Sequence, residues 1–412
     1  MAGDRMRVNR SAAGVAAALA ATLVLAGCGG HSSPSAAGGG SNPSSSASPV
    51  SATPLKVVWV KPHHLSATGS IRVRFAKQLT SATPLPTLTP KVPGSWARQG
   101  TTAVFTPSHA YPPDTTVTVS YVKKSGTTKT LASAATPTGS LLRAEQILAR
   151  LHYLPLTTTA PTLTTAADEA NAVFNPPAGT FSWRYPNTPS VIKQGWSAGK
   201  YGIVVRGAII AFQHQHGLPI DGTVGIHTWR ALIKADLADK LDPDKYSYVT
   251  ADLYLPQRLS VWVDGKTVLT SPVNGGVAAA PTPLGTFPVY ERFTSTTMQG
   301  TNPDGTKYKD PGVPWVNYFS GGSAVHGFPR ASYGFPQSVG CLELPIPTAA
   351  EVFKLIDYGT LVNVHGPYVK PPPVATPAPP SPSPSSSSKP TPTHSPSPNP
   401  SSTKSHAKKP AH

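Results

Sequence analysis

Two residues in the C-terminal part of the chain have the types and spacing of a nucleophile and its base. Cys341 lies in the stretch SVGCLELP (338–345), and His326 precedes it by fifteen residues at the end of the apolar segment SAVHG. A thiolate attacks an amide carbonyl far better than a thiol does, and a nearby imidazole can accept the thiol proton and later protonate the leaving amine. The pair predicts acyl transfer through a cysteinyl intermediate.

The other cysteine of the chain is expected to be unavailable for a disulfide. Cys28 follows a positively charged start and an apolar run of about fifteen residues, a pattern typical of an export signal too short to span a bilayer. The ending Leu25-Ala26-Gly27-Cys28 resembles the bacterial lipobox, in which the cysteine is acylated. We therefore expect residues 1–27 to be a lipoprotein signal peptide, with Cys28 as the lipidation site and Cys341 as a free thiol outside the cytoplasm. The alternative is an ordinary signal with an incidental Cys28.

Composition separates the two ends of the chain from its folded middle. Residues 28–54 predict a flexible tether, and residues 367–412 predict a disordered, basic Pro/Ser-rich tail. The formal net charge is +17, or +15 once the three arginines and one aspartate of residues 1–27 are removed. Such a charge favours polyanions like anionic lipid and cell-wall polymer, although it also serves solubility. No nucleic-acid-binding module is visible, so no nucleic-acid partner is expected.

The middle of the chain predicts a multidomain protein with two non-catalytic domains. Residues 55–136 alternate apolar and polar side chains at a period of two, which indicates an antiparallel β-sandwich. This stretch resembles bacterial Ig-like domains and is interpreted as a spacer. Residues 139–240 have helical periodicity. Their pattern FQ…GL…DG.VG..TW..L, from Phe212 to Leu232, resembles the three-helix peptidoglycan-binding module.

The third domain, residues 246–366, is predicted to be mostly β with one main helix, and it resembles the L,D-transpeptidase catalytic domain. The resemblance is carried by TPLGTF (282–287), by His326-Gly327, and by Ser338-x-Gly340-Cys341. It implies that Cys341 is the nucleophile, that His326 is the general base and acid, and that the Gly327 carbonyl orients the histidine. The backbone amides around Gly340 and Cys341 are expected to form an oxyanion hole, with Ser338 supporting the motif.

Further residues near this motif are expected to shape the donor cleft. Trp315, Tyr318 and Phe319 precede the histidine strand and are predicted to line the cleft, with core packing as the alternative. The polar segment 295–312 is predicted to be a lid. Two positions depart from the family pattern: Val339 stands where a histidine is usual, and Glu343 where arginine or asparagine is common.

No metal or organic cofactor is expected. His63 and His64 are adjacent, and His214 and His216 lie two residues apart on a helix, so neither pair can ligate one ion jointly. His365 follows the last predicted strand, and its distance from Cys341 is open.

The resemblance implies a membrane-anchored enzyme that faces the cell wall. Cys341 would attack the amide between the third residue of a peptidoglycan stem peptide and its terminal D-Ala, forming a thioester. The side-chain amine of another stem's third residue would then complete a crosslink between two third residues. One alternative is an L,D-carboxypeptidase that uses the same thiol. The other is a non-catalytic wall-binding lipoprotein. The oligomeric state is left open.

Overall fold

The structure is a computed structural model that describes residues 56–61, 64–122 and 126–367. The predicted signal peptide, Cys28, the tether, His63 and the tail beyond residue 367 lie outside the described residues, and their assignments stay predictions. None of the helices in the described ranges has the length and apolar character needed to cross a membrane.

The first folded region consists of two antiparallel sheets. One has the strand order β1 (Val57–Lys61), β2 (Ile71–Phe75), β5 (Thr102–Pro107) and β4 (Gly94–Gln99). The other contains β3 (Thr87–Thr89), β6 (Thr116–Val122) and β7 (Thr128–Ala135). Alternation decides which side chains are buried: in β2, Ile71, Val73 and Phe75 face the core and the two arginines between them face solvent. Both sheets contribute to one apolar core. The likeness to Ig-like domains stays a prediction.

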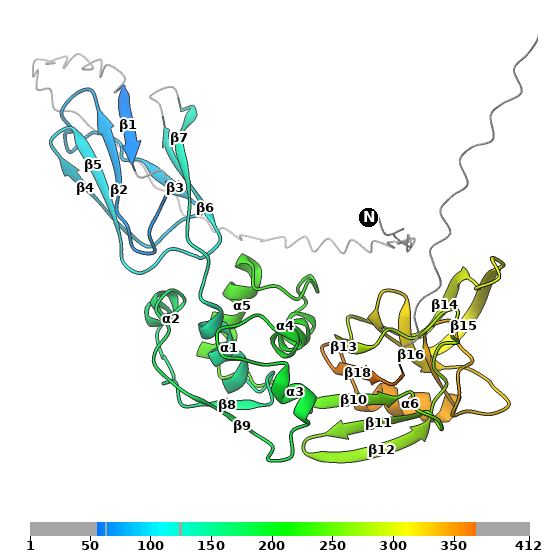
Figure 1. Cartoon of the computed structure of the whole chain (residues 1–412). Coiled ribbons are helices and arrows are strands. Elements are labelled where there is room, and N and C mark those ends of the chain that lie inside the picture. The colour runs from blue at the N-terminus through cyan, green and yellow to red at the C-terminus, as the bar shows by residue number, and fades with distance from the viewer. Residues whose placement is uncertain (1–55, 62–63, 123–125, 368–412) are drawn as a thin grey trace, which may run out of the picture. The chain divides into compact units, whose positions relative to one another are not determined.

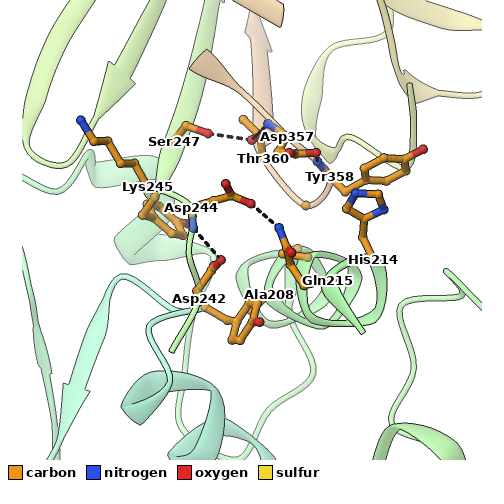
Figure 2. Close-up of a pocket in the computed structure, with 15 residues that line it drawn as sticks. Ala208, His214, Gln215, Asp242, Asp244, Lys245, Ser247, Asp357, Tyr358 and Thr360 are labelled. Atoms are coloured by element: carbon orange, nitrogen blue, oxygen red, sulfur yellow. Dashed lines mark hydrogen bonds between the residues drawn. The ribbon is translucent and has the colours of Figure 1, made fainter. Parts of the chain in front are cut away.

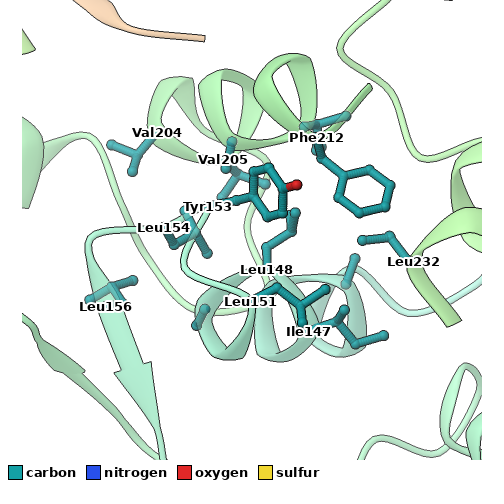
Figure 3. Close-up of a cluster of buried hydrophobic side chains, with 14 of the residues drawn as sticks. Ile147, Leu148, Leu151, Tyr153, Leu154, Leu156, Val204, Val205, Phe212 and Leu232 are labelled. Carbon is teal, nitrogen blue, oxygen red and sulfur yellow. The ribbon is translucent and has the colours of Figure 1, made fainter. Parts of the chain in front are cut away.

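The second region is more elaborate than the three helices that the sequence predicted. Within residues 139–240 the structure has α1 (Leu141–Arg150), α2 (Ala166–Ala172), α3 (Ser190–Gln194), α4 (Ile203–Gln215) and α5 (Ile226–Leu237), together with β8 (Leu156–Thr158) and β9 (Phe181–Trp183). Figure 3 shows Ile147 and Leu148 of α1, Phe212 of α4 and Leu232 of α5 in one buried cluster. The two extra helices and the small sheet lie between α1 and α4. The simple three-helix form is therefore not confirmed.

His214 of α4 and His216, the residue directly after α4, both stack on aromatic rings. His216 stacks on Phe212 with ring centroids 3.9 Å apart, and its Nδ1 lies 2.9 Å from the Phe212 carbonyl oxygen. His214 stacks on Tyr358 of the third region, also at 3.9 Å.

The third region contains two sheets and one helix (Figure 1), which confirms the predicted mostly-β domain with a single main helix. The five-stranded sheet has the order β12 (Lys266–Pro272), β11 (Arg258–Val263), β10 (Ser247–Asp252), β18 (Leu361–His365) and β13 (Gly285–Pro288). The four-stranded sheet has the order β14 (Glu291–Thr301), β15 (Lys307–Ser320), β16 (Ser323–Gly327) and β17 (Leu342–Leu344). Helix α6 (Ile346–Leu355) follows β17 directly, and its buried residues Ala349 and Val352 join the core that both sheets share.

The second and third regions pack against each other through α4 and the turn before β18. Leu361 of β18, with Tyr248 and Trp262 of the same sheet, belongs to the apolar cluster of the helical region. A cavity of about 40 Å³ lies at this contact. Figure 2 shows Asp242, Asp244 and other polar side chains that line it. Cys341 is not among the residues that line it.

Two glycines allow this close approach. A Cβ atom on Gly359 would lie 2.2 Å from the carbonyl oxygen of Gly207 in α4, and Gly359 has a φ of +81°. A side chain at position 359 would therefore push the third region away from α4, and it would also strain the backbone.

We expect Gly359→Ala to lower the free energy of unfolding by about 2–4 kcal/mol, because a positive φ costs about 1–2 kcal/mol in a non-glycine residue and the clash adds to it. The matched control is Gly305→Ala: its φ is +88°, but a Cβ there has no neighbour within 4 Å. Urea denaturation of both variants separates the two contributions, and equal losses would show that the contact between α4 and the turn carries no strain.

Candidate active site

A short parallel strand pairing brings the predicted nucleophile and base together. Strands β16 and β17 lie side by side with Val325 opposite Leu342 and His326 opposite Glu343. Cys341 immediately precedes β17, so continuing this register places it opposite Ala324. Because alternate residues of a strand share a face, His326 and Cys341 lie on the same face as diagonal neighbours. Both line one cavity.

His326 is held in one orientation and one protonation state. Its side chain is 3% exposed, and its Nδ1 donates to the carbonyl oxygen of Gly327 at 3.0 Å. The predicted contact with Gly327 is therefore present. Burial lowers the pKa of His326, and the Gly327 bond and the charge of Glu343 only partly oppose this shift. With the proton on Nδ1, the lone pair on Nε2 is free to accept a proton.

The thiol of Cys341 is also uncharged. The residue is half-buried, and its Sγ donates a weak hydrogen bond to the carbonyl oxygen of Gly322 at 3.8 Å. Burial raises the pKa of the Cys341 thiol to about 12, although the backbone N–H of Ala324 lowers it, and the Glu343 charge raises it further. The resting site therefore contains a neutral thiol beside a neutral imidazole.

The loop before β17 is shaped by Ser338. Its hydroxyl donates to the Cys341 carbonyl oxygen at 2.6 Å and accepts from the N–H of Gly340 at 3.2 Å. Gly340 adopts a φ of +111°, which favours glycine. These two bonds link Ser338 to the backbone around Cys341, and its supporting role stays a prediction. The N–H of Gly340, predicted as an oxyanion donor, is already bonded in this structure, which leaves the N–H of Cys341 as the better candidate of the two.

The segment before β13 holds the same loop from the other side. Thr282, from the TPLGTF motif, donates to the Cys341 carbonyl oxygen at 3.4 Å and accepts from the N–H of Gly276 at 2.8 Å. Asn274 is fully buried, and its side chain accepts from the N–H of Gly334 and donates to the carbonyl oxygen of Ser332. Sequence reasoning missed Asn274; the only signal for it is a polar residue directly before two glycines.

The catalytic cavity, as we call the space lined by His326 and Cys341, has a volume of about 280 Å³. One wall comes from the β14–β15 hairpin and contains Met298, Asn302, Tyr308, Asp310 and Val313. The segment 295–312, predicted as a lid, is in fact largely strand, because β14 and β15 pair from Glu291–Tyr318 to Thr301–Lys307. It forms the cavity wall as part of a sheet.

The three predicted cleft residues have different positions. Phe319 is 2% exposed in the core, and Trp315 packs partly buried against the same core and against the Phe353 ring. None of the three predicted cleft residues, Tyr318 included, lines the catalytic cavity. Tyr318 packs against the same small apolar cluster as Cys341. Burial raises the pKa of Tyr318 to about 12, and Cys341 contributes to this shift. The Nδ1 atom of His365 lies 3.8 Å from Oδ1 of Asp252, and His365 does not line the cavity.

Both departures from the family pattern line the cavity. Val339 is 37% exposed there. Glu343 is 4% exposed, and both of its carboxylate oxygens accept from Arg330, each at 2.8 Å. The Arg330 guanidinium also lies 4.6 Å from the centroid of the Phe328 ring. The negative charge introduced by Glu343 is thus balanced within the site by a residue that the sequence did not indicate.

We expect Glu343→Ala to destabilise the protein, because it leaves the Arg330 guanidinium partly buried without its carboxylate. The loss should be about 1–3 kcal/mol, measured as a lower Tm in thermal denaturation. Glu351→Ala is the control, since the Glu351–Lys354 pair is exposed and such pairs contribute little. Equal effects of the two substitutions would contradict a structural role for the Arg330–Glu343 pair.

Because the resting thiol is neutral, its alkylation should depend steeply on pH. With the pKa of Cys341 raised to about 12, the thiolate fraction grows as pH rises towards that value. The rate of reaction with iodoacetamide should therefore increase about tenfold per pH unit from about pH 6 to pH 9. Cys341→Ala, which retains Cys28, supplies the background rate. A pH-independent rate over that range would indicate a resting thiolate–imidazolium pair instead.

Comparison with known proteins agrees with this geometry. Residues 247–364 match the family model of the L,D-transpeptidase catalytic domain, and residues 189–232 match that of a peptidoglycan binding domain. No curated protein matches the chain.

Solved L,D-transpeptidases are also similar. The catalytic domain of an Enterococcus faecium L,D-transpeptidase has 30% identity, covering 29% of this chain and 96% of that one, with a TM-score of 0.27. The same domain acylated by ertapenem has 30% identity, covering 30% and 98%, with a TM-score of 0.26. An L,D-transpeptidase from Mycobacterium smegmatis has 16% identity, covering 76% and 100%, with a TM-score of 0.27. Because these TM-scores are low, the family membership follows from the sequence matches. The chain belongs to the L,D-transpeptidase family.

Proposed function

We propose that the protein is a peptidoglycan L,D-transpeptidase that joins the third residues of two stem peptides through a thioester on Cys341. The observation that carries this proposal is the arrangement at the start of β17: a cysteine in the same cavity as a buried histidine whose Nδ1 is bonded to Gly327. The family membership supplies the substrate class, because this class of domain acts on peptidoglycan stems.

The neutral resting pair defines the first step. The Nε2 of His326 accepts the thiol proton as Cys341 attacks the carbonyl between the third residue and D-Ala. The tetrahedral oxyanion accepts a hydrogen bond from the N–H of Cys341. The imidazolium then protonates the leaving nitrogen, so that D-Ala departs and a thioester remains. Attack by the side-chain amine of an acceptor stem breaks the thioester, forms the new amide and returns the thiol.

The helical region is proposed to increase the local concentration of this substrate. Its match to a peptidoglycan binding domain and its direct packing against the catalytic region support this role. Both domain matches support a location outside the cytoplasm, at the cell wall. We further propose that acylated Cys28 anchors the chain to the membrane, as the lipobox-like sequence indicates.

Carbapenem acylation tests the nucleophile and its base. Because an ertapenem-acylated relative is known, incubation with ertapenem should give a mass adduct on this protein. Cys341→Ala should abolish the adduct, and His326→Ala should slow its formation by about 100-fold or more, since no group then accepts the thiol proton. The absence of an adduct on the unmodified protein would favour a non-catalytic wall-binding role.

The products distinguish transpeptidation from hydrolysis. With a disaccharide-tetrapeptide substrate, mass spectrometry should show crosslinked dimers and free D-Ala. Release of D-Ala without dimers would identify a carboxypeptidase instead. This outcome would leave Cys341 and His326 in their roles and replace only the acceptor.

A further inference from the structure

The catalytic cavity has a net negative charge in a strongly basic chain. Three of its lining residues carry a full charge: Asp310, Arg330 and Glu343. Arg330 and Glu343 neutralise each other through two hydrogen bonds, and His326 and Cys341 are uncharged at rest. Asp310 is therefore the uncompensated charge of this cavity, although the formal net charge of the chain is +17.

The strand register directs Asp310 into the cavity. It lies on β15 opposite Met298, and it shares a face with Tyr308, two residues earlier. All three line the cavity, whereas Lys307 and Lys309 lie at alternate positions and are exposed.

Asp310 is close enough to the reacting groups for its charge to act on them. It opposes the burial that lowers the pKa of His326, and it adds to the effect of Glu343 in raising the pKa of Arg330. Within the described part of the chain, its half-buried carboxylate makes no hydrogen bond and no ion pair. The group is thus available to a ligand that enters the cavity.

We propose that Asp310 binds the acyl acceptor: its carboxylate receives the protonated primary amine of the acceptor stem in the cavity that contains Cys341. This inference rests on the proposed transpeptidation, which needs such an amine. An ammonium group complements the single negative charge of the wall, whereas an additional carboxylate at this position would be repelled by it.

The acceptor step balances as follows. The ammonium held by Asp310 loses one proton to solvent, and the free amine attacks the thioester carbonyl. A C–N bond forms and the C–S bond breaks. His326 takes the second proton from the nitrogen and transfers it to the departing sulfur, which restores the neutral thiol and imidazole.

The position of Asp310 predicts an effect on acceptor binding more than on chemistry. A carboxylate increases occupancy by the ammonium form, but it also makes loss of the first proton harder. The first consequence acts on the KM for the acceptor, and the second acts on kcat. Removing the charge should therefore raise that KM without lowering kcat.

The test uses the mature full-length protein and its variants Asp310→Asn and Asp310→Glu, with Glu351→Gln as a carboxylate control on the exposed face of α6. The donor is a disaccharide-tetrapeptide. The acceptor is a stem peptide with a free side-chain amine, and the same peptide with that amine acetylated is the blank. Ertapenem adduct formation, D-Ala release and dimer formation are measured on each protein.

We expect Asp310→Asn to raise the acceptor KM about tenfold, a larger change than its effect on the rate of ertapenem adduct formation. Its products should shift from dimer towards hydrolysed tripeptide. Asp310→Glu should recover part of the acceptor affinity, and Glu351→Gln should match the unmodified protein.

Two results would overturn the inference while the proposed function stands: an unchanged acceptor KM in Asp310→Asn, or an equal loss of ertapenem acylation, which would place Asp310 with the donor chemistry. If the unmodified protein is acylated and releases D-Ala but forms no dimer, transpeptidation itself fails, and the acceptor site fails with it.

Discussion

The chemistry of this protein depends on the parallel pairing of two short strands. Strand β17 has only three residues, yet its register with β16 decides that Cys341 and His326 share a face. Val325, Leu342 and Leu344 of these strands are fully buried in the core that the two sheets share with α6, and this burial stabilises the pairing. A slip of one residue would turn His326 and Glu343 to opposite faces. The apolar side chains therefore determine a catalytic distance, although none of them touches the substrate.

Burial shifts the pKa values of Cys341 and His326, the proposed reacting groups, in opposite directions, and both shifts favour the neutral form. It raises the pKa of the thiol and lowers that of the imidazole, so both are neutral at rest. The only full charges in the wall are then those of Asp310 and of the Arg330–Glu343 pair. In the proposed mechanism, Cys341 starts as a neutral thiol, and charge forms only as the acyl donor is attacked. A neutral thiol is also less susceptible to oxidation than a thiolate.

Some features of the catalytic region could be predicted from the sequence because their signals are local. The turn at Gly340, the apolar strand that contains His326 and the single helix before the last strand all follow from patterns a few residues long. The additional helices and the small sheet of the helical region could not be predicted in this way. Helices α2 and α3 have five to seven residues, too short for their periodicity to stand out. The segment 295–312 was predicted to be a lid because its glycines and prolines are typical of loops. Its residues nevertheless pair as strands.

The sequence by itself indicated the proposed reacting groups: a cysteine and a histidine fifteen residues apart, each in a recognisable motif, within a mostly-β domain. Only the tertiary structure decided their charge state and their surroundings. Arg330 finds Glu343 thirteen residues further along the chain, and Asp310 reaches the cavity through the pairing of two long strands. Phe319 has a residue type that suits a cleft wall, but its position on the strand places it in the core. The physical reason is that desolvation and charge pairing depend on what lies across a cavity, and strands distant in sequence supply those neighbours.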